Sequence, residues 1–270
     1  MNPIVLITVN YNNYSDTDAF VESLLKQTSR DFKLVVVDIS KNKIKKKYPT
    51  FTHIIPAENK GYAHGLNVGL RFALGQGFER FSFINNDTKV KSNFIAQVTR
   101  SLSENPSSLI GGKIYYYPGF EYHNGKYAKK DVGKVIWYAG GILDWRNVFT
   151  IHRGVDEVDK GQYDTFETTD FVTGCLMNFD KSFFSNVGYM DESYFLYYED
   201  ADWCERTKQK KCKIFYDPKI VIWHKNGQST GGSGSMLQIK YQERNRIKFG
   251  LRHAPWRTKI HLIKNYFIRR

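Results

Sequence analysis

The chain has 270 residues, of which 41% are hydrophobic and 16% aromatic, a composition typical of a globular protein with a substantial core. It has no run of about eighteen apolar residues, and residues 1–9 lack the charged and cleavage regions of a signal peptide, so we expect neither a membrane-spanning helix nor export. The three cysteines, Cys175, Cys204 and Cys212, lack the spacing of a zinc site and suggest a reducing compartment.

The net charge of +13 is concentrated at the C-terminal end of the chain. Residues 206–270 contain 17 lysines and arginines against 2 acidic residues, a balance of +15, so the rest of the chain carries −2. Nucleic acid is one kind of partner that such a segment suits, and an anionic membrane surface or an anionic lipid-linked substrate is another. Residues 256–270 interleave aromatic, aliphatic and cationic side chains, which favours an interfacial helix, with a solvated amphipathic helix as the open alternative.

The first hundred residues alternate between apolar runs and segments with helical periodicity. Residues 4–9 and 34–38 are β-branched runs, typical of strands buried on both faces. Ser15-x-x-Asp18 suggests a capping box for a first helix. A short strand at residues 53–55, a helix at 62–74 and a strand at 81–84 follow. This alternation predicts an α/β fold with a mostly parallel, doubly wound central sheet and helices on both faces.

Beyond residue 110 the pattern changes to short strand candidates between glycine-rich turns. Residues 135–138, 148–152 and 171–179 predict a small antiparallel extension of the sheet. Two more short strands are expected at residues 214–216 and 220–224. Residues 226–235 contain four glycines and three serines, which predicts a mobile lid. A helix at residues 236–252 and the basic tail complete the chain.

Polar residues follow the predicted strands at their carboxyl ends, where ligands of doubly wound sheets bind. Asn10, Asp38, Asn59 and Asp87 all occupy such positions. A capping or turn role is the structural alternative for each of them. Their coincidence at one edge of the sheet is the first indication of a site.

Gly61, Gly65 and Gly69 recur every four residues at the start of the helix predicted at 62–74. A glycine costs about 1 kcal/mol relative to alanine in a helix interior, so each needs a reason such as close backbone approach. We attribute Gly65 and Gly69 to packing against a strand, and Asn59, Lys60 and Gly61 to an anion site at the helix entry. The segment is neither a Walker loop nor a dinucleotide fingerprint.

Two further groups of polar residues could carry chemistry. Residues 191–206 form an aromatic run that ends in carboxylates, and these are either the acidic first turn of an exposed helix or the floor of a cleft that contains a base. Asn85-Asn86-Asp87 follows a strand and could bind a divalent cation, since a cation that bridges a diphosphate needs only one or two protein carboxylates. His224 could add a ligand, and a satisfied core histidine is the alternative.

At this point the residues resemble a known family. The segments NYNN, VVVD, ENKGYAHGLNVGL, FINNDT, TGCLMNF, YFLYYEDADWCER and WHKNGQS occur in the order found in family 2 glycosyltransferases with a GT-A fold. The chain is most similar to the bacterial rhamnosyltransferase-like and galactofuranosyltransferase-like enzymes, from about residue 4 to 249, including YQERNRIKF. The resemblance implies a GT-A fold with a Rossmann-like central sheet and a C-terminal helical region. It also implies inverting, divalent-metal-dependent transfer of a sugar, with rhamnose as a candidate, from a nucleotide diphosphate to a hydroxyl group in cell-surface polysaccharide biosynthesis.

The resemblance also assigns roles to particular residues. Asp200 is expected to be the catalytic base. Glu199 and Asp202 are the nearby alternatives, with an orienting role toward Arg206, one helical turn further, favoured for Asp202. Mg²⁺ or Mn²⁺ would be held by Asp87 and His224, while Asn85, which replaces the first Asp of the metal motif, brings an amide oxygen without charge. The acceptor would contact Glu199, Tyr197 and Trp203. The nucleotide sugar would be bound by Asn10, Tyr11, Asp38, Asn59, Lys60, Gly61, Asn85 and Asn86.

The resemblance suggests a division of the chain and a setting for the enzyme. Residues 1–235 would form the catalytic domain, with a nucleotide-binding half at 1–105 and an acceptor-binding half at 106–235, and residues 236–270 a basic amphipathic helical segment. The partners would be a nucleotide-diphosphate sugar and a glycan or lipid-linked acceptor. We expect no nucleic acid, because the excess charge lies outside the motif-bearing part. The expected location is the cytoplasm or the inner face of the cell membrane, and a non-catalytic nucleotide- or polysaccharide-binding relative is the alternative function.

Overall fold

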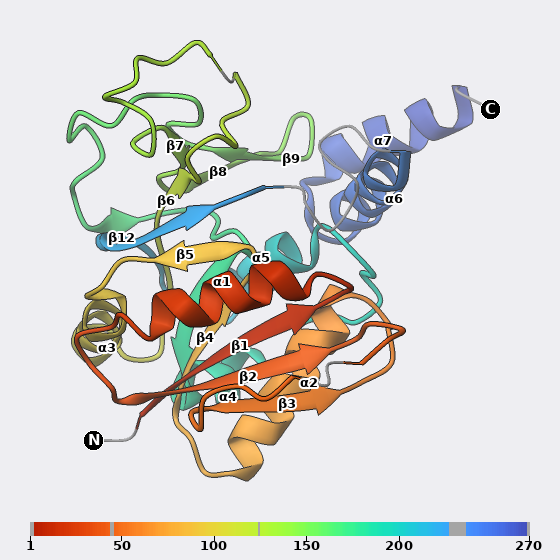
Figure 1. Cartoon of the computed structure of the whole chain (residues 1–270). Helices are drawn as coiled ribbons and strands as arrows, with labels where there is room; N and C mark the ends of the chain where they lie inside the picture. Colours follow the sequence, from red (N-terminus) through yellow and green to blue (C-terminus); the bar gives the residue numbers. More distant parts are fainter. Residues whose placement is uncertain (1–2, 44–45, 124, 227–235, 269–270) are drawn as a thin grey trace.

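The structure, a computed structural model, describes residues 3–43, 46–123, 125–226 and 236–268 (Figure 1). Its first part alternates strands and helices as expected. β1 pairs in parallel with β2 and β4, and β2 pairs in parallel with β3. Helices α1 and α2 lie on opposite faces of these strands (Figure 1). The elements of this part are β1 (Ile4–Asn10), α1 (Tyr14–Leu24), β2 (Phe32–Asp38), β3 (Thr52–Pro56), α2 (Tyr62–Gly75) and β4 (Arg80–Ile84).

The second part extends the same sheet with shorter elements. In order they are β5 (Thr88–Val90), α3 (Phe94–Glu104), β6 (Leu109–Tyr116), β7 (Ile136–Tyr138), β8 (Gly141–Asp144), β9 (Phe149–His152), β10 (Glu167–Thr168), β11 (Leu176–Asp180), α4 (Lys181–Val187), α5 (Glu199–Gln209) and β12 (Ile214–His224). Strands β8 and β9 form a separate two-stranded antiparallel sheet. The expected antiparallel extension is thus confirmed.

The main sheet has the order β10-β12-β6-β11-β4-β1-β2-β3, with β5 paired to β12 and β7 paired to β6. Along this path β3, β2, β1, β4, β6 and β12 run in one direction, and β11 and β10 run against them. The prediction of an α/β fold with a mostly parallel central sheet is therefore confirmed. Strands β1, β2 and β3 point toward the end of the molecule that carries the C-terminal helices (Figure 1).

The glycines of α2 show how closely this helix packs on the sheet. A Cβ at Gly65 would lie 2.7 Å from Val9 Cγ2, and one at Gly69 would lie 2.4 Å from Ile7 Cγ2. Both distances are too short for a real contact, so the helix can lie this near to β1 only because these positions lack a side chain. The structural explanation of Gly65 and Gly69 is confirmed.

Three local predictions are corrected by the structure. The first helix is capped by Asn13, whose side chain accepts a hydrogen bond from Asp16 N, so Ser15 lies inside the helix and starts no capping box. The strands expected at 214–216 and 220–224 are one strand, β12, whose pairing with β6 shifts between Asp217 and Val221. The absence of a side chain at Gly112 of β6 leaves space for this irregularity, because a Cβ there would lie 2.5 Å from Ile220 O.

The strand expected at residues 171–179 is shorter than predicted. Leu176 N donates to Thr173 O, so residues 173–176 form a turn and only Leu176–Asp180 continue as β11. The turn brings Gly174 and Cys175 to the cavity described below. Of the lid expected at residues 226–235, residues 227–235 lie outside the described part of the chain.

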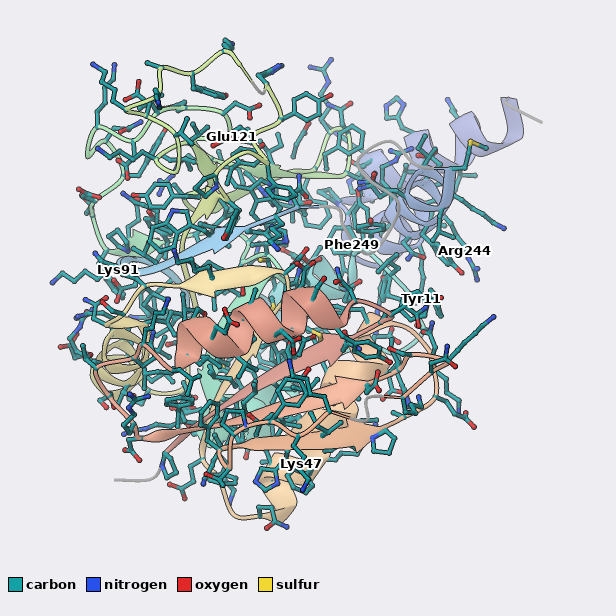
Figure 2. All side chains as sticks on the ribbon, viewed as in Figure 1. Tyr11, Lys47, Lys91, Glu121, Arg244 and Phe249 are labelled. Atoms are coloured by element: carbon teal, nitrogen blue, oxygen red, sulfur yellow. The ribbon has the colours of Figure 1, made fainter. Side chains whose placement is uncertain are left out.

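Two helices end the chain, α6 (Met236–His253) and α7 (Trp256–Ile268), which pack on each other beside β8 and β9 (Figure 1). Helix α6 is anchored by Phe249, labelled in Figure 2, which is fully buried and stacks on Trp145 with ring centroids 5.5 Å apart. The helix expected at residues 236–252 and the C-terminal helical region are therefore confirmed, and α6 is joined to the core. No helix in the described ranges has both the length and the hydropathy to cross a membrane.

Candidate active site

A cavity of about 900 Å³ lies beyond the carboxyl ends of the parallel strands, between the strand-end loops, the start of α5 and one side of α6. Ten of the fourteen residues predicted for the site line it, and four do not. The ten are Tyr11, Asn59, Gly61, Asn85, Asn86, Asp87, Tyr197, Glu199, Asp200 and His224. Residues from segments far apart in the sequence thus converge on one space large enough for a nucleotide sugar.

Asn10 and Asp38 lie beneath the cavity and are fully buried. Asn10 Nδ2 donates to Asp38 Oδ1 at 3.1 Å and to Ser40 Oγ at 3.0 Å. Its Oδ1 accepts from Thr17 Oγ1 at 3.1 Å and from Asn86 Nδ2 at 3.2 Å. All hydrogen-bonding positions of the Asn10 amide are therefore used inside the protein. Asn10 and Asp38 join β1 to β2 and support the cavity floor, and neither is among the residues that line the cavity.

The predicted anion site at the entry of α2 is only partly assembled. Lys60 does not line the cavity, because its exposed side chain pairs with Glu58 at 2.9 Å on the outside of the loop. Gly61, in contrast, has φ +102°, and a Cβ there would lie 2.4 Å from Phe195 O. This close approach allows Tyr62 N to donate to Phe195 O at 2.9 Å. Gly61 therefore joins the start of α2 to the segment that leads into α5.

Asp87 and His224 come together because β12 pairs with β5, which sets His224 opposite Thr88. Asp87 Oδ1 lies 3.2 Å from His224 Nε2, and both side chains are 5% exposed. Beyond this contact with His224, Asp87 Oδ1 has no hydrogen-bond partner within the described residues, and His224 Nδ1 has none there. Buried oxygen and imidazole ligands with unused capacity suit a divalent cation.

The same part of the chain holds no cluster of three or more His, Cys, Asp or Glu residues that could bind a metal by themselves. A cation at Asp87 and His224 would therefore have to complete its coordination with other oxygens. A diphosphate supplies such oxygens, and Mg²⁺ in particular is usually bound through one or two carboxylates plus substrate phosphates. The residues present fit a cation that binds together with a nucleotide diphosphate.

The turn before α5 is strained. Tyr197 and Tyr198 have φ of 67° and 70°, and left-handed conformations of non-glycine residues cost on the order of 1–3 kcal/mol each. Hydrogen bonds from α6 stabilise this turn: Asn245 Nδ2 donates to Leu196 O at 2.8 Å and to Tyr197 O at 3.0 Å. Tyr198 Oη also donates to Val148 O at 2.8 Å. The result is a fixed turn that directs the first residues of α5 into the cavity.

Glu199 and Asp200 are adjacent carboxyl groups in different surroundings. Asp200 Oδ2 accepts from Gly174 N and its Oδ1 from Ala201 N, both at 2.8 Å. Glu199 Oε2 is buried and has no hydrogen-bond partner in the described structure. Burial raises the pKa of both groups, and the charge of Asp200 raises the pKa of Glu199 further, to well above its usual range. Two N–H donors favour the ionised form of Asp200, and Glu199 Oε2 has no such donor, so the surroundings favour ionisation of Asp200 over that of Glu199.

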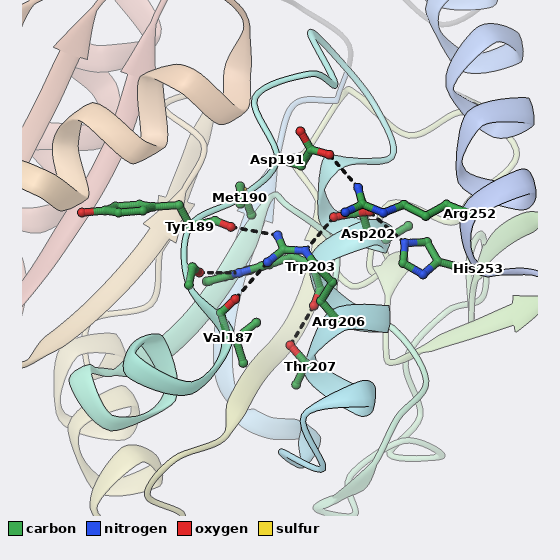
Figure 3. A network of polar contacts seen from close by, with 12 residues as sticks. Val187, Tyr189, Met190, Asp191, Asp202, Trp203, Arg206, Thr207, Arg252 and His253 are labelled. Carbon is green, nitrogen blue, oxygen red and sulfur yellow. Dashed lines mark hydrogen bonds and ion pairs between the residues drawn. The ribbon is translucent and has the colours of Figure 1, made fainter.

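Asp202 has a structural role at the opposite side of α5 (Figure 3). Its Oδ2 accepts from Arg206 Nε at 2.8 Å, so the expected orientation of Arg206 is confirmed. Its Oδ1 accepts from His253 Nε2 at 2.8 Å and lies 3.1 Å from Arg252 on α6. Burial would raise the pKa of Asp202, but the hydrogen bonds from His253 and Arg206 lower it below its usual value. Asp202 joins α5 to α6.

The predicted acceptor contact of Trp203 is wrong. Helix α5 turns this side chain into the core, where it is fully buried and stacks on Phe83 with ring centroids 5.5 Å apart. Its indole N–H donates to Gly188 O at 2.9 Å, so even its polar atom is used internally.

Several residues of the cavity were not predicted from the sequence. Tyr62, Gly174 and Arg246 line it, and Asn245 supports it from outside the lining. All four lie inside the segments that carry the family resemblance, so that resemblance could have marked them as candidate site residues. His152 also lines the cavity, and burial lowers its pKa to about 4, so its imidazole is neutral. No local pattern marks His152, because its role depends on the tertiary packing.

Comparisons with known proteins agree with this geometry. The model of the family "Glycosyl transferase family 2" matches residues 5–184, well over half of the chain. The low-salt glycan biosynthesis hexosyltransferase Agl10 of Haloferax volcanii is 22% identical over 92% of this chain and 75% of its own length. The dTDP-rhamnosyl transferase RfbF of Shigella flexneri is 24% identical over 84% of this chain and 70% of its own.

A solved structure shows the same fold. The crystal structure of GalNAc-T7 with UDP, GalNAc and Mn²⁺ superposes with a TM-score of 0.66 and 16% sequence identity. The similarity covers 90% of this chain and 47% of that chain, so the present chain spans about half the length of GalNAc-T7. The GT-A fold expected from the sequence is therefore confirmed, as is the likeness to rhamnosyltransferases. The chain belongs to glycosyl transferase family 2 and is a glycosyltransferase enzyme.

Proposed function

We propose that the enzyme inverts the anomeric centre and, with a divalent cation, moves a sugar from a nucleotide diphosphate to a hydroxyl group of a glycan or lipid-linked acceptor in surface polysaccharide biosynthesis. One observation carries the proposal: a single cavity contains the Asp87–His224 pair and the carboxyl group of Asp200, which accepts two backbone N–H hydrogen bonds. In this proposal residues 1–105 hold most of the donor and residues 106–235 bind the acceptor. Helix α6 closes one side of the cavity.

The proposed reaction needs one base and one stabilised leaving group. Asp200 takes the proton of the acceptor hydroxyl as its oxygen bonds to the anomeric carbon, and the bond from that carbon to the diphosphate breaks. Mg²⁺ or Mn²⁺, held by Asp87 and His224, would neutralise the negative charge that develops on the diphosphate. Glu199, which keeps its proton, can donate a hydrogen bond to an acceptor oxygen. Tyr197 and Tyr11 offer rings on which sugar or base can stack.

The names of the relatives and the ligands of the solved neighbour limit the choice of candidate donor sugars. One is named a dTDP-rhamnosyl transferase and another a hexosyltransferase, and the solved neighbour contains UDP and Mn²⁺. We therefore propose dTDP-rhamnose as the first candidate donor and UDP-hexoses as the second. A thermal-shift screen of dTDP, UDP and GDP sugars with Mn²⁺ should show the largest stabilisation for dTDP-rhamnose. Equal stabilisation by all of them would leave the rhamnose assignment without support.

The acceptor side of the molecule fits a lipid-linked substrate at an anionic membrane surface. Trp256, Ile260 and Ile263 of α7 are between 44% and 67% exposed and lie on one helix face at spacings of four and three residues. The same helix carries the cations Arg257, Lys259 and Lys264. Apolar side chains beside cations are typical of helices that lie in a membrane interface. The protein should sediment with vesicles that contain anionic lipid, less so at high salt, and not with neutral vesicles.

The assignment of Asp200 is tested by Asp200→Asn. Loss of a general base lowers turnover by about 10²- to 10⁴-fold. Donor binding measured by calorimetry should be unchanged, because in this proposal Asp200 faces the acceptor and does not contact the donor. Asp31→Asn, at an exposed carboxylate before the amino end of β2, is the matched control and should retain full turnover. Full activity of Asp200→Asn would remove Asp200 as the base.

The cation is tested by chelation. EDTA should abolish turnover and nucleotide-induced thermal stabilisation, and Mg²⁺ or Mn²⁺ should restore both. Asp87→Ala should prevent this restoration, since it removes the carboxylate of the pair. Turnover that is insensitive to EDTA would exclude a cation at Asp87 and His224.

A further inference from the structure

Tyr62 lies where the two sides of the cavity meet. It is the first residue of α2 and lines the cavity. Its hydroxyl oxygen lies 2.6 Å from the side-chain oxygen of Asn85, on the donor side, and 3.0 Å from Gly174 O, on the acceptor side. A single hydroxyl group therefore contacts residues from two different walls.

One proton cannot serve both contacts. A tyrosine hydroxyl has one hydrogen to donate, and both neighbours are acceptors when the Asn85 oxygen faces it. In the same amide orientation, Asn85 Nδ2 faces His224 Nε2 at 3.4 Å, beside Asp87. The oxygen and nitrogen of an amide are distinguished by their hydrogen bonds, so the two orientations have to be compared by the bonds they allow.

Rotation of the Asn85 amide by half a turn resolves the conflict. Its NH₂ then donates to the Tyr62 oxygen, and the Tyr62 hydrogen is free to donate to Gly174 O. The same rotation turns the Asn85 oxygen toward Asp87 and His224. The amide then presents an oxygen, the atom that a divalent cation prefers, to the proposed cation site.

The second contact of Tyr62 reaches the base. Gly174 accepts from Tyr62 through its carbonyl group, and its N–H donates to Asp200 Oδ2 at 2.8 Å. Gly174 also lies between these two side chains: a Cβ there would make ordinary contacts, 3.4 Å from Asp200 Oδ2 and 3.6 Å from Tyr62 Cε1. Tyr62 thus fixes the residue whose N–H stabilises the Asp200 carboxylate.

We propose that Tyr62 is a positioning residue that turns the Asn85 oxygen toward the cation and holds the Gly174 peptide against Asp200. The proposal rests on the proposed function, since it concerns the same cation and base. It explains how an asparagine can serve in the first position of the metal motif. A carboxylate has two equivalent oxygens and needs no orientation, whereas an amide needs a partner that selects its oxygen.

The test compares Tyr62→Phe with Tyr216→Phe. Tyr216 is buried and its hydroxyl donates to the backbone oxygen of Tyr163 at 3.0 Å, so this control removes a hydrogen bond of the same kind away from the cavity. Mn²⁺ affinity is measured by electron paramagnetic resonance with dTDP or UDP present. Tyr62→Phe should weaken Mn²⁺ binding by about 10- to 100-fold, the usual effect of losing a partner that orients a metal ligand. Tyr216→Phe should bind Mn²⁺ like the wild type.

Repeating the comparison in an Asn85→Asp variant tests whether the orientation of the Asn85 amide is the cause of the effect. In Asn85→Asp the side chain presents an oxygen in either rotation, so adding Tyr62→Phe should leave Mn²⁺ affinity unchanged. An equal loss in both backgrounds would indicate a general structural effect and overturn the proposal. So would wild-type Mn²⁺ affinity in Tyr62→Phe. If the wild type itself binds no Mn²⁺ with either nucleotide, the proposed cation dependence fails as well, an outcome distinct from the other two.

Discussion

The two walls of the cavity are built in different ways. On the donor wall, Asn85 and Asp87 follow β4 and His224 ends β12, so regular strand pairing sets their positions. On the acceptor wall, Asp200 follows two tyrosines in left-handed conformations. The first wall is set by strand pairing, and the second is held by contacts from α6. The donor wall should therefore tolerate loss of contacts from α6, and the acceptor wall should not.

The largest effect is expected where the walls touch. Gly61→Ala would place a Cβ 2.4 Å from Phe195 O at φ +102°. Backbone strain of this kind costs on the order of 1–3 kcal/mol, and displacement of Phe195 would add to it. We expect a large loss of unfolding free energy in urea, together with loss of turnover, because the turn that carries Asp200 moves.

A second glycine of α2 provides the control for this prediction. A Cβ at Gly75 would meet nothing within 4 Å. Gly75→Ala should therefore stabilise the protein, by about 0.4–1 kcal/mol, through the reduced flexibility of the unfolded chain. Similar unfolding free energies for Gly61→Ala and Gly75→Ala would mean that the contact between the walls is unimportant.

The donor wall could largely be predicted from the sequence. The alternation of apolar runs and helical periodicity is a local signal, and the rule that ligands bind at strand carboxyl ends located Asn85, Asp87 and the entry of α2. The rule did not say how deep each residue lies. Asn10 and Asp38 are hydrogen-bonded to each other beneath the floor of the cavity. No sequence pattern indicates whether a polar side chain forms such a buried hydrogen bond.

For the acceptor wall, the sequence predicted the carboxylates but not the contacts that hold them in place. The carboxylates of residues 191–206 pointed to a base, but the strained turn depends on Asn245, 48 positions after Tyr197. Trp203 was misassigned for a related reason. Its place in an acidic motif suggested the cavity, while the orientation of α5, set by the core, turned it inward.

The next effect tests the support of the acceptor wall. Asn245→Ala leaves Leu196 O and Tyr197 O without their donor, which should cost about 1–3 kcal/mol of unfolding free energy. The turnover number should fall while donor affinity stays the same, because the donor wall does not depend on Asn245. Kinetics at saturating donor, with calorimetry of donor binding, measure the two separately.

A buried asparagine outside the cavity provides the control for Asn245. Asn178 of β11 donates to Ile110 O at 2.9 Å and is fully buried. Asn178→Ala should lose similar stability and retain its turnover number once it is folded. If both variants lose turnover in proportion to stability, the acceptor wall has no special dependence on α6.

The smallest effect concerns the charge on the acceptor wall. Burial, with the neighbouring charge of Asp200, raises the folded-state pKa of Glu199 above its unfolded value of about 4.3. Below that value Glu199 is protonated in both states. As pH rises toward the folded pKa only the unfolded state releases the proton, so the wild type loses up to about 1.4 kcal/mol per pH unit in this window.

Glu199→Gln removes this titration, because the amide has no proton to release. The difference in unfolding free energy between variant and wild type should therefore shift in favour of the variant as pH rises from 4 to 8. Urea unfolding with EDTA present measures it without a contribution from bound cations. Parallel pH dependences would mean that Glu199 ionises normally, and the distinction between a charged Asp200 and a protonated Glu199 would then be lost. A difference that moves in favour of Glu199→Gln across this window would instead support a raised pKa for Glu199 beside Asp200.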